Sequence, residues 1–126
     1  MVGSRFRRAS RRDCEIVRLT MRILYDTIKV VKTIRETEVY KRWFIGLRDT
    51  VAKARILVRL RRASLGNYGD VRDLGDHVSE FRFFFGPGYR IYFTEREGEI
   101  IILLAGGDKS TQAADIIKAK AFAANL

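Results

Sequence analysis

Polar side chains alternate with apolar ones in two short runs on either side of Gly86-Pro87-Gly88. The runs span Val78–Phe85 and Tyr89–Thr94, and their alternate polar positions are Glu80, Arg82, Arg90 and Tyr92. Successive side chains of a strand lie on opposite faces of a sheet, so paired strands would place these four residues on one face. Guanidinium groups bind phosphate oxygens in bidentate fashion. The pattern therefore indicates a patch that can bind a phosphate-containing ligand.

The two runs also predict their own pairing. Glycines permit a tight turn at residues 86–88, which places Phe85 opposite Tyr89 and Arg82 opposite Tyr92. The apolar face then carries Phe81, Phe83, Phe85, Ile91 and Phe93. A slip by one residue would oppose Arg90 to the apolar face, and burying an unpaired guanidinium group is costly. The polar residues are equally consistent with ordinary cross-strand pairs, each of which contributes about 0.2–1 kcal/mol.

A second element that attracts anions lies in Gly106-Gly107-Asp108-Lys109-Ser110-Thr111. It joins an apolar strand to a predicted helix, whose free N–H groups and dipole favour phosphate. Lys109 adds a point charge. The string lacks the flanking pattern of a P-loop, and it is also consistent with a simple turn followed by a helix cap.

RNA can be cleaved by attack of its own 2′-OH, which needs in-line geometry, a proton acceptor, a proton donor and cations. Arg82, Arg90 and Lys109 are the candidate cations. The candidates for proton transfer are Tyr92, Glu80, His77 and Asp108, and none of them is favoured over the others. A single Cys14 and a single His77 cannot form a four-ligand zinc site, so we expect no metal and no cofactor.

Hydrophobic periodicity predicts the elements that position these residues. The β-branched and partly alternating segment Thr27–Ile34 is predicted to form a strand. Thr37 caps a helix that ends near Gly46, and Asp49 caps a second helix that stops at Gly66-Asn67. The buried face of that second helix is predicted to carry Ile56, Leu57, Leu60 and Ala63.

The second half of the chain is mostly strand. Strands are predicted at Gly69–Leu74, Val78–Phe85, Tyr89–Thr94 and Glu99–Ala105. Ser110 or Thr111 then caps a last helix. The fold class expected from this order is α+β, a small and mainly antiparallel sheet with an N-terminal helical hairpin and a C-terminal helix.

The net charge of +10 over 126 residues favours polyanions as partners. Residues 1–26 form a basic arm, consistent with a disordered leader or with a functional segment, and residues 27–126 form the predicted domain. Within that domain the residues expected to contact RNA are Lys53, Arg61, Arg62 and Arg72. No apolar run is long enough to cross a membrane, and the cysteine usage is typical of a cytoplasmic protein.

The stretches Phe81–Phe93, Leu103–Gln112 and Asp115-Ile116 resemble the RelE/ParE toxin superfamily, and most closely its HigB-like addiction-module killer proteins. The resemblance covers about residues 27–124. It implies the toxin of a type II toxin–antitoxin module that cleaves mRNA on the ribosome and inhibits translation. It also implies a cognate antitoxin, a HigA-like helix-turn-helix protein. Arg82, Arg90 and Lys109 match positions where RelE-type toxins carry basic residues around the scissile phosphate.

One departure from the family pattern affects the implied chemistry. RelE-type toxins carry a tyrosine early in the C-terminal helix, and this chain has Asp115 there. Proton transfer is therefore not assigned by analogy. The alternative implied by the resemblance is a non-catalytic, ParE-like toxin that poisons a protein target such as DNA gyrase.

Overall fold

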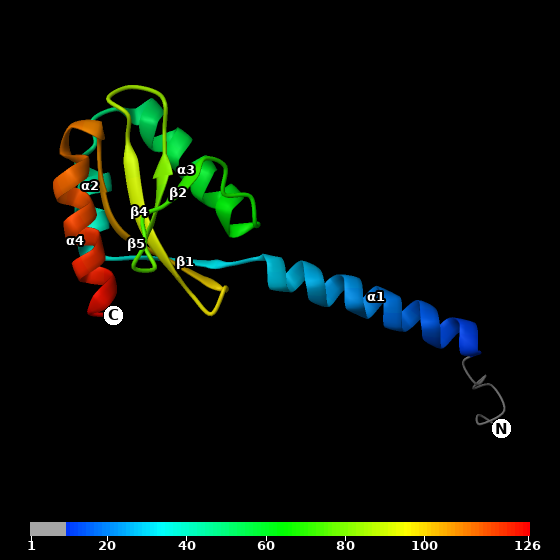
Figure 1. Ribbon diagram of the computed structural model, residues 1–126. Coiled ribbons are helices and arrows are strands. Elements are labelled where there is room, and N and C mark those ends of the chain that lie inside the picture. Colours follow the sequence, from blue (N-terminus) through cyan, green and yellow to red (C-terminus); the bar gives the residue numbers. More distant parts are fainter. Residues whose placement is uncertain (1–9) are drawn as a thin grey trace. The chain divides into compact units, whose positions relative to one another are not determined.

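The computed structural model describes residues 10–126 (Figure 1). The described residues divide into two units, 10–30 and 31–126. Helix α1, Arg11–Val30, belongs to the first unit and contains residues 11–26 of the predicted basic arm. The part of that arm in residues 1–9 lies outside the described residues.

The strand predicted at Thr27–Ile34 is wrong in its first half. Residues 27–30 complete α1, and strand β1 spans only Thr33–Glu36. The apolar residues Val17, Met21, Leu24 and Ile28 recur at helical spacing, and this period extends into the β-branched segment.

The second unit is an α+β fold whose five-stranded sheet has the order β1-β5-β4-β3-β2. The remaining strands are β2 (Val71–Asp73), β3 (Ser79–Arg82), β4 (Arg90–Arg96) and β5 (Ile100–Gly107). β1 pairs with β5 in parallel, and the other neighbours are antiparallel. The prediction of a mainly antiparallel sheet is therefore confirmed.

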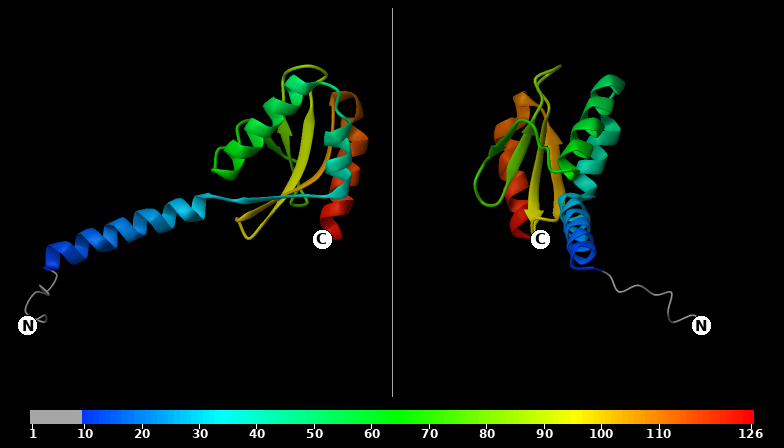
Figure 2. Two further views of the ribbon diagram at one scale, coloured as in Figure 1. Left: turned by 180° about the vertical axis from the view of Figure 1, so that it is seen from behind. Right: turned by 90° about the vertical axis from the view of Figure 1, so that its right-hand side faces the viewer.

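The N-terminal helical hairpin is not clearly formed, because the N-terminal part is helix α1 followed by strand β1. Helices α2 (Glu38–Gly46) and α3 (Thr50–Ser64) come after β1, with Thr37 and Asp49 as N-caps. Both cap side chains accept a backbone N–H, from Tyr40 and Ala52 respectively. The backbone leaves α2 extended at Leu47 (ψ 127°), and α3 runs obliquely to α2 (Figure 2).

Helices cover both faces of the sheet (Figure 2). The core on one face combines α2, α3 and the sheet, and its largest members include Tyr40, Ile56, Phe81, Ile91 and Leu103. The core on the other face lies under α4 (Gln112–Ala124) and is built from Val78, Tyr92, Ile102, Leu104, Ala105 and Ala119. Both faces of the central strands are therefore buried.

Leu57 is 54% exposed, although we predicted it on the buried face of α3. It follows the buried Ile56 by about 100° around the helix, which carries it past the edge of the contact with the sheet. Ile56, Leu60 and Ala63 are buried as predicted.

The β3–β4 pairing differs from the prediction by two residues. Arg82 lies opposite Arg90, and Phe81 lies opposite Ile91. The loop between the strands is longer than three residues, because Phe83 N–H donates to the carbonyl of Tyr89 at 3.1 Å. A shift of two keeps every side chain on its predicted face, so the division into apolar and polar faces is confirmed.

No helix within residues 10–126 has both the length and the apolar character needed to cross a membrane.

Candidate functional site

A pocket of about 290 Å³ lies beside the loop that joins β3 to β4. It is lined by Phe83, Phe84, Gly86, Pro87, Gly88, Arg90 and Lys109. Lys109 reaches the loop because its backbone N–H lies 3.4 Å from the carbonyl oxygen of Pro87. Two of the predicted cations, Arg90 and Lys109, therefore meet in one pocket although 18 residues separate them in the chain.

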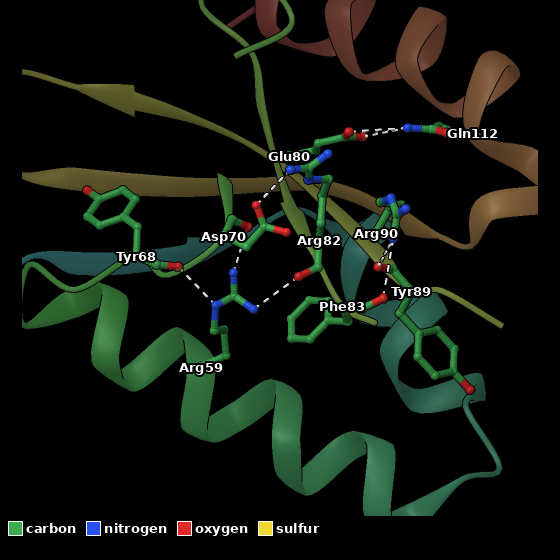
Figure 3. Close-up of polar contacts among 9 residues, drawn as sticks. All are labelled: Arg59, Tyr68, Asp70, Glu80, Arg82, Phe83, Tyr89, Arg90 and Gln112. Atoms are coloured by element: carbon green, nitrogen blue, oxygen red, sulfur yellow. Dashed lines mark hydrogen bonds and ion pairs between the residues drawn. The ribbon is translucent and has the colours of Figure 1, made fainter. Parts of the chain in front are cut away.

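Arg90 is only 7% exposed and organises the loop (Figure 3). Its Nη1 atom donates to the carbonyl oxygens of Phe83, Gly88 and Tyr89 at 3.3, 3.1 and 3.1 Å. Its Nε atom is buried without a hydrogen-bond partner within residues 10–126. Arg90 thus holds the pocket wall with one nitrogen and keeps a second donor unused.

Arg82 lies opposite Arg90 in the ladder, and like charges at opposed positions destabilise a sheet. Asp70 compensates for part of this repulsion, because its carboxylate accepts from Arg82 Nη2 at 2.8 Å. This hydrogen bond raises the pKa of Arg82. The Arg82 side chain remains one-third exposed (33%), so it can reach a ligand at the surface.

Arg59 of α3 fixes the backbone around Asp70 and Arg82, which sequence reasoning missed (Figure 3). Its guanidinium group donates to three carbonyl oxygens, of Tyr68 at 2.9 Å, Asp70 at 2.6 Å and Arg82 at 3.0 Å. Burial lowers the pKa of Arg59. A Cβ on Gly69, where φ is +69°, would lie 2.6 Å from Arg59 Nε, so this contact requires glycine. The sequence signal for it was Gly69, which we predicted as the first residue of a strand.

Glu80 and Tyr92 do not belong to an exposed patch, because α4 covers them. Both are 0% exposed. The two carboxylate oxygens of Glu80 accept from Gln112 Nε2 at 3.2 and 3.1 Å (Figure 3). Burial raises the pKa of Tyr92, and the charges of Glu80 and Asp115 raise it further. Tyr92 is therefore a neutral, enclosed phenol, unsuited to giving a proton to a ligand at the surface.

The turn after β5 is shaped by packing. A Cβ on Gly106 would lie 2.1 Å from Trp43 Cε3, and one on Gly107 would lie 2.0 Å from the Asp115 carboxylate. Glycine at these two positions therefore leaves room for the side chains of Trp43 and Asp115.

Asp108 caps the 3₁₀ turn Lys109–Thr111 by accepting from Ser110 N–H at 2.8 Å. The hydrogen bonds from Ser110 lower the pKa of Asp108, so it is a weak base.

His77 lies at the opposite end of β3 from Arg82, in the exposed turn before Val78. Its backbone carbonyl accepts from Thr94 Oγ1 at 2.6 Å. It lines a different pocket, together with Tyr68, Asp73 and Glu95 among others. The structure therefore does not place His77 near Arg82, Arg90 or Lys109.

The four residues predicted to contact RNA also lie outside the pocket at the loop. Lys53 is near the start of α3 and donates to the Ile45 carbonyl at 3.2 Å. Arg61 and Arg62 are exposed in the last turn of α3, and Arg72 is exposed on the edge strand β2.

Phe84 is the most exposed large apolar side chain of the pocket, at 79%. Arg82 Cζ lies 5.8 Å from the centre of its ring. Sequence reasoning did not single it out. The sequence did contain a signal for Phe84. Alternation along the strand places residue 84 on the same face as Glu80 and Arg82, and a phenylalanine on that polar face is unusual in the pattern.

A protein of Haemophilus influenzae (strain ATCC 51907 / DSM 11121 / KW20 / Rd), named only as an uncharacterized protein, is 42% identical to this chain over 93 residues. The match covers 74% of this chain and 94% of the Haemophilus protein. No family model matches the chain. No solved structure matches it either.

Proposed function

The chain belongs to the same family as the Haemophilus influenzae protein, and from the pocket at its β3–β4 loop we propose that it is an RNA-cleaving toxin. In this proposal it is the toxin of a type II toxin–antitoxin module, of the RelE/ParE superfamily and its HigB-like branch. Its substrate is mRNA on the ribosome, and its action inhibits translation. It requires no metal or cofactor.

The observation that carries the proposal is the combination of an exposed aromatic ring with three cations. Phe84 is 79% exposed and flanked by Arg82, while Arg90 and Lys109 line the same pocket. Single-stranded RNA is bound by stacking of splayed bases on aromatic side chains and by cations along its phosphates. The pocket and the neighbouring Arg82 therefore offer both beside the β3–β4 loop.

Each residue has a distinct part in this scheme. Phe84 stacks on a base, and Arg82 and Lys109 bind the phosphate that follows it. Arg90 holds the loop through three carbonyl oxygens, and its positive charge, together with that of Lys109, stabilises developing negative charge in the pocket. The contribution of the protein is then positioning and charge stabilisation.

One observation favours the second candidate, a non-catalytic toxin that poisons a protein such as DNA gyrase. Among the described residues that line the pocket, none is a carboxylate, a histidine or an accessible tyrosine. Cleavage in this pocket therefore needs proton transfer by groups of the ribosome or of the RNA. A toxin that only binds its target needs no such groups.

The two candidates are separated by expressing the wild-type chain and mapping transcripts by primer extension. A ribonuclease gives defined breaks in mRNA that is being translated. A gyrase poison leaves transcripts intact and gives gyrase-linked DNA breaks, and this result would overturn the proposal.

The substitution Arg82→Ala with Lys109→Ala tests the assignment of the site. We expect loss of mRNA cleavage and weaker binding to a short oligouridine probe. Removing two phosphate contacts should reduce the slope of log K against log salt by about 1.4 for a single strand. The control is Arg96→Ala with Arg35→Ala, which removes two exposed arginines elsewhere on the domain. Equal cleavage and equal salt slopes in both double variants would contradict the assignment.

A further inference from the structure

Helix α1 is the only described element of the first unit, so it has no second element within that unit to pack on. Four of its apolar side chains, those of Ile16, Val17, Leu19 and Met21, are each more than half exposed. Helices in proteins gain most of their stability from packing of an apolar face, and an isolated helix is marginally stable in water. The apolar side of α1 is therefore a surface that a partner outside this unit must cover.

The residues after the first turn of α1 divide into a charged side and an apolar side. At 100° per residue, Glu15, Arg18 and Arg22 share a sector of about 60°. The remaining residues from 14 to 22 are Cys14, Ile16, Val17, Leu19, Thr20 and Met21. They span about 220° of the helix, which is much wider than the seam of a two-helix coiled coil. Pairing with α1 of a second copy would therefore leave much of this apolar side in water.

The polar groups on the apolar side have hydrogen-bond partners within or beside the helix itself. Thr20 lies in the middle of that side and donates its hydroxyl to the carbonyl of Ile16 at 2.9 Å. At the start of the helix, the Asp13 carboxylate accepts from Ser10 N–H at 3.2 Å, and Ser10 Oγ accepts from Asp13 N–H at 3.1 Å. A polar group costs free energy in an apolar phase unless it is hydrogen-bonded. This side of α1 is therefore suited to contact with lipid hydrocarbon.

The charge of this part of the chain identifies the kind of surface. Residues 1–22 contain seven arginines and two acidic residues, a net charge of +5. Arg18 and Arg22 lie four residues apart, and like charges at that spacing destabilise a helix in water. Anionic headgroups would remove this repulsion. RNA would also bind the arginines, but it would leave the apolar side in water. An anionic lipid surface therefore matches both sides of α1.

We propose that α1 binds the surface of an anionic phospholipid membrane. The helix lies in the plane of the interface and does not cross the bilayer. Ile16, Val17 and Met21 contact the acyl chains, and Arg18 and Arg22 lie among the phosphates. This inference is independent of the proposed function, because it uses only the first unit and none of the residues of the pocket at the β3–β4 loop.

The test is cosedimentation of the full chain with lipid vesicles. One set of vesicles contains phosphatidylglycerol and phosphatidylcholine in equal amounts, and the other contains phosphatidylcholine alone. We expect binding to the phosphatidylglycerol vesicles, and weaker binding as the salt concentration rises, because salt screens the arginines. Failure to bind these vesicles, or equal binding to both sets, would overturn the inference.

The double variant Arg18→Ala with Arg22→Ala tests the charged side. We expect its affinity for the phosphatidylglycerol vesicles to fall by about thirtyfold, the contribution of two arginines near an anionic surface. The matched control is Arg35→Ala with Arg96→Ala, which removes two exposed arginines of the second unit and should bind as the wild type does. Equal losses in the two double variants would show attraction by the total charge of the chain and contradict a role for α1.

The double variant Val17→Ser with Met21→Ser tests the apolar side and leaves every charge in place. It should bind the phosphatidylglycerol vesicles at least about tenfold more weakly, because two apolar side chains are lost from the interface. The control is Ile45→Ser with Ile117→Ser, two exposed apolar residues of the second unit, which should bind as the wild type does. Circular dichroism confirms that each variant is folded. Wild-type binding by the α1 variant would refute contact with the acyl chains.

Cysteine accessibility maps the orientation of the helix. In a Cys14→Ser background, which removes the only cysteine, Thr20→Cys lies in the middle of the apolar side and Glu15→Cys on the charged side. Phosphatidylglycerol vesicles should slow the reaction of the thiol at position 20 with a water-soluble maleimide and leave the thiol at position 15 reactive. Equal protection at both positions would contradict a helix that lies in the interface.

The same variants separate the other possible occupants. Sedimentation equilibrium without lipid detects self-association through Val17 and Met21, and urea unfolding detects packing of these residues on the second unit. Either effect, with no binding of the wild type to vesicles, would overturn the inference and identify the true occupant. Binding of oligouridine that is lost in the Arg18 and Arg22 variant, again without vesicle binding, would make α1 a nucleic-acid-binding arm.

Discussion

Tyr92 carries its hydroxyl group into the interface between the sheet and α4, where nothing in residues 10–126 accepts or donates a hydrogen bond to it. Leaving a buried hydroxyl unpaired costs free energy relative to water. Arg59 is the contrasting case, since its side chain is matched by three carbonyl oxygens. Arg59 therefore stabilises the fold around Arg82. The unpaired hydroxyl of Tyr92 instead destabilises the contact between the sheet and α4.

The substitution Tyr92→Phe should raise the free energy of unfolding at pH 7 by about 1 kcal/mol, because it removes only the unpaired hydroxyl. Burial raises the pKa of Tyr92 in the folded state above its ordinary value of about 10. The unfolded chain therefore loses this proton first, and the stability of the wild type falls as the pH rises above about 10. The variant lacks the contribution of Tyr92 to this loss.

Urea unfolding at pH 7 and at several pH values above 10 measures both effects. Tyr40 also has a pKa raised by burial, so part of the alkaline loss remains in the variant. A variant that is less stable than wild type at pH 7 would show that the hydroxyl group has a partner.

Strand β5 is the element that places Lys109 next to the β3–β4 loop, and its end is set by two side chains. Trp43 of α2 packs on Gly106, and Asp115 of α4 packs on Gly107. Helices on the two faces of the sheet thus each pack against one of two adjacent glycines. Any side chain at these two positions would push a helix away, so the end of β5 requires glycine at both.

The substitution Gly106→Ala should lower the free energy of unfolding by about 1–3 kcal/mol, the usual cost of overpacking a core. Its control is Gly46→Ala, where no atom lies within 4 Å of the added Cβ and the residue ends a helix. That variant should be unchanged or more stable by up to about 1 kcal/mol. Thermal unfolding of both variants gives the comparison. Equal stabilities would mean that the close packing of Trp43 on β5 does not exist in solution.

At the scale of the whole molecule, both hydrophobic cores lie inside the second unit. Every residue of the two cores falls between Ile34 and Ala123. Even the first strand of this unit is held from within it, since Lys32 and Thr33 donate to the carbonyls of Ser64 and Glu99. Among the residues whose side chains the structure describes, 10–22 and 31–126, the second unit therefore holds both hydrophobic cores.

Deleting residues 1–30 should change the free energy of unfolding of the second unit by less than about 0.5 kcal/mol, the usual range for changes outside a core. Urea unfolding followed by tryptophan fluorescence reports on Trp43 in α2 and measures this directly. A large loss of stability or a broadened transition would show that the first unit contributes to the fold of the second.

The order of elements in the second unit could be predicted from sequence, because caps and alternation are local signals. Thr37 and Asp49 cap the predicted helices, and Phe81 and Ile91 lie on the predicted face. The burial of Glu80 and Tyr92 could not be predicted. This burial depends on which side chains α4 places over the sheet. Glu80 accepts a hydrogen bond from Gln112, which lies 32 residues further along the chain. The role of Arg59 could not be predicted either, because its three carbonyl partners lie 9 to 23 residues away in the chain.

The two outer strands of the sheet are short and charged. β1 has four residues, with Arg35 and Glu36 exposed, and β2 has three, with Arg72 and Asp73 exposed. An open sheet edge is a template on which other chains add strands, and short charged edges resist this. We conclude that the open sheet is protected at both ends against edge-to-edge aggregation, even when the chain is made in excess of any partner.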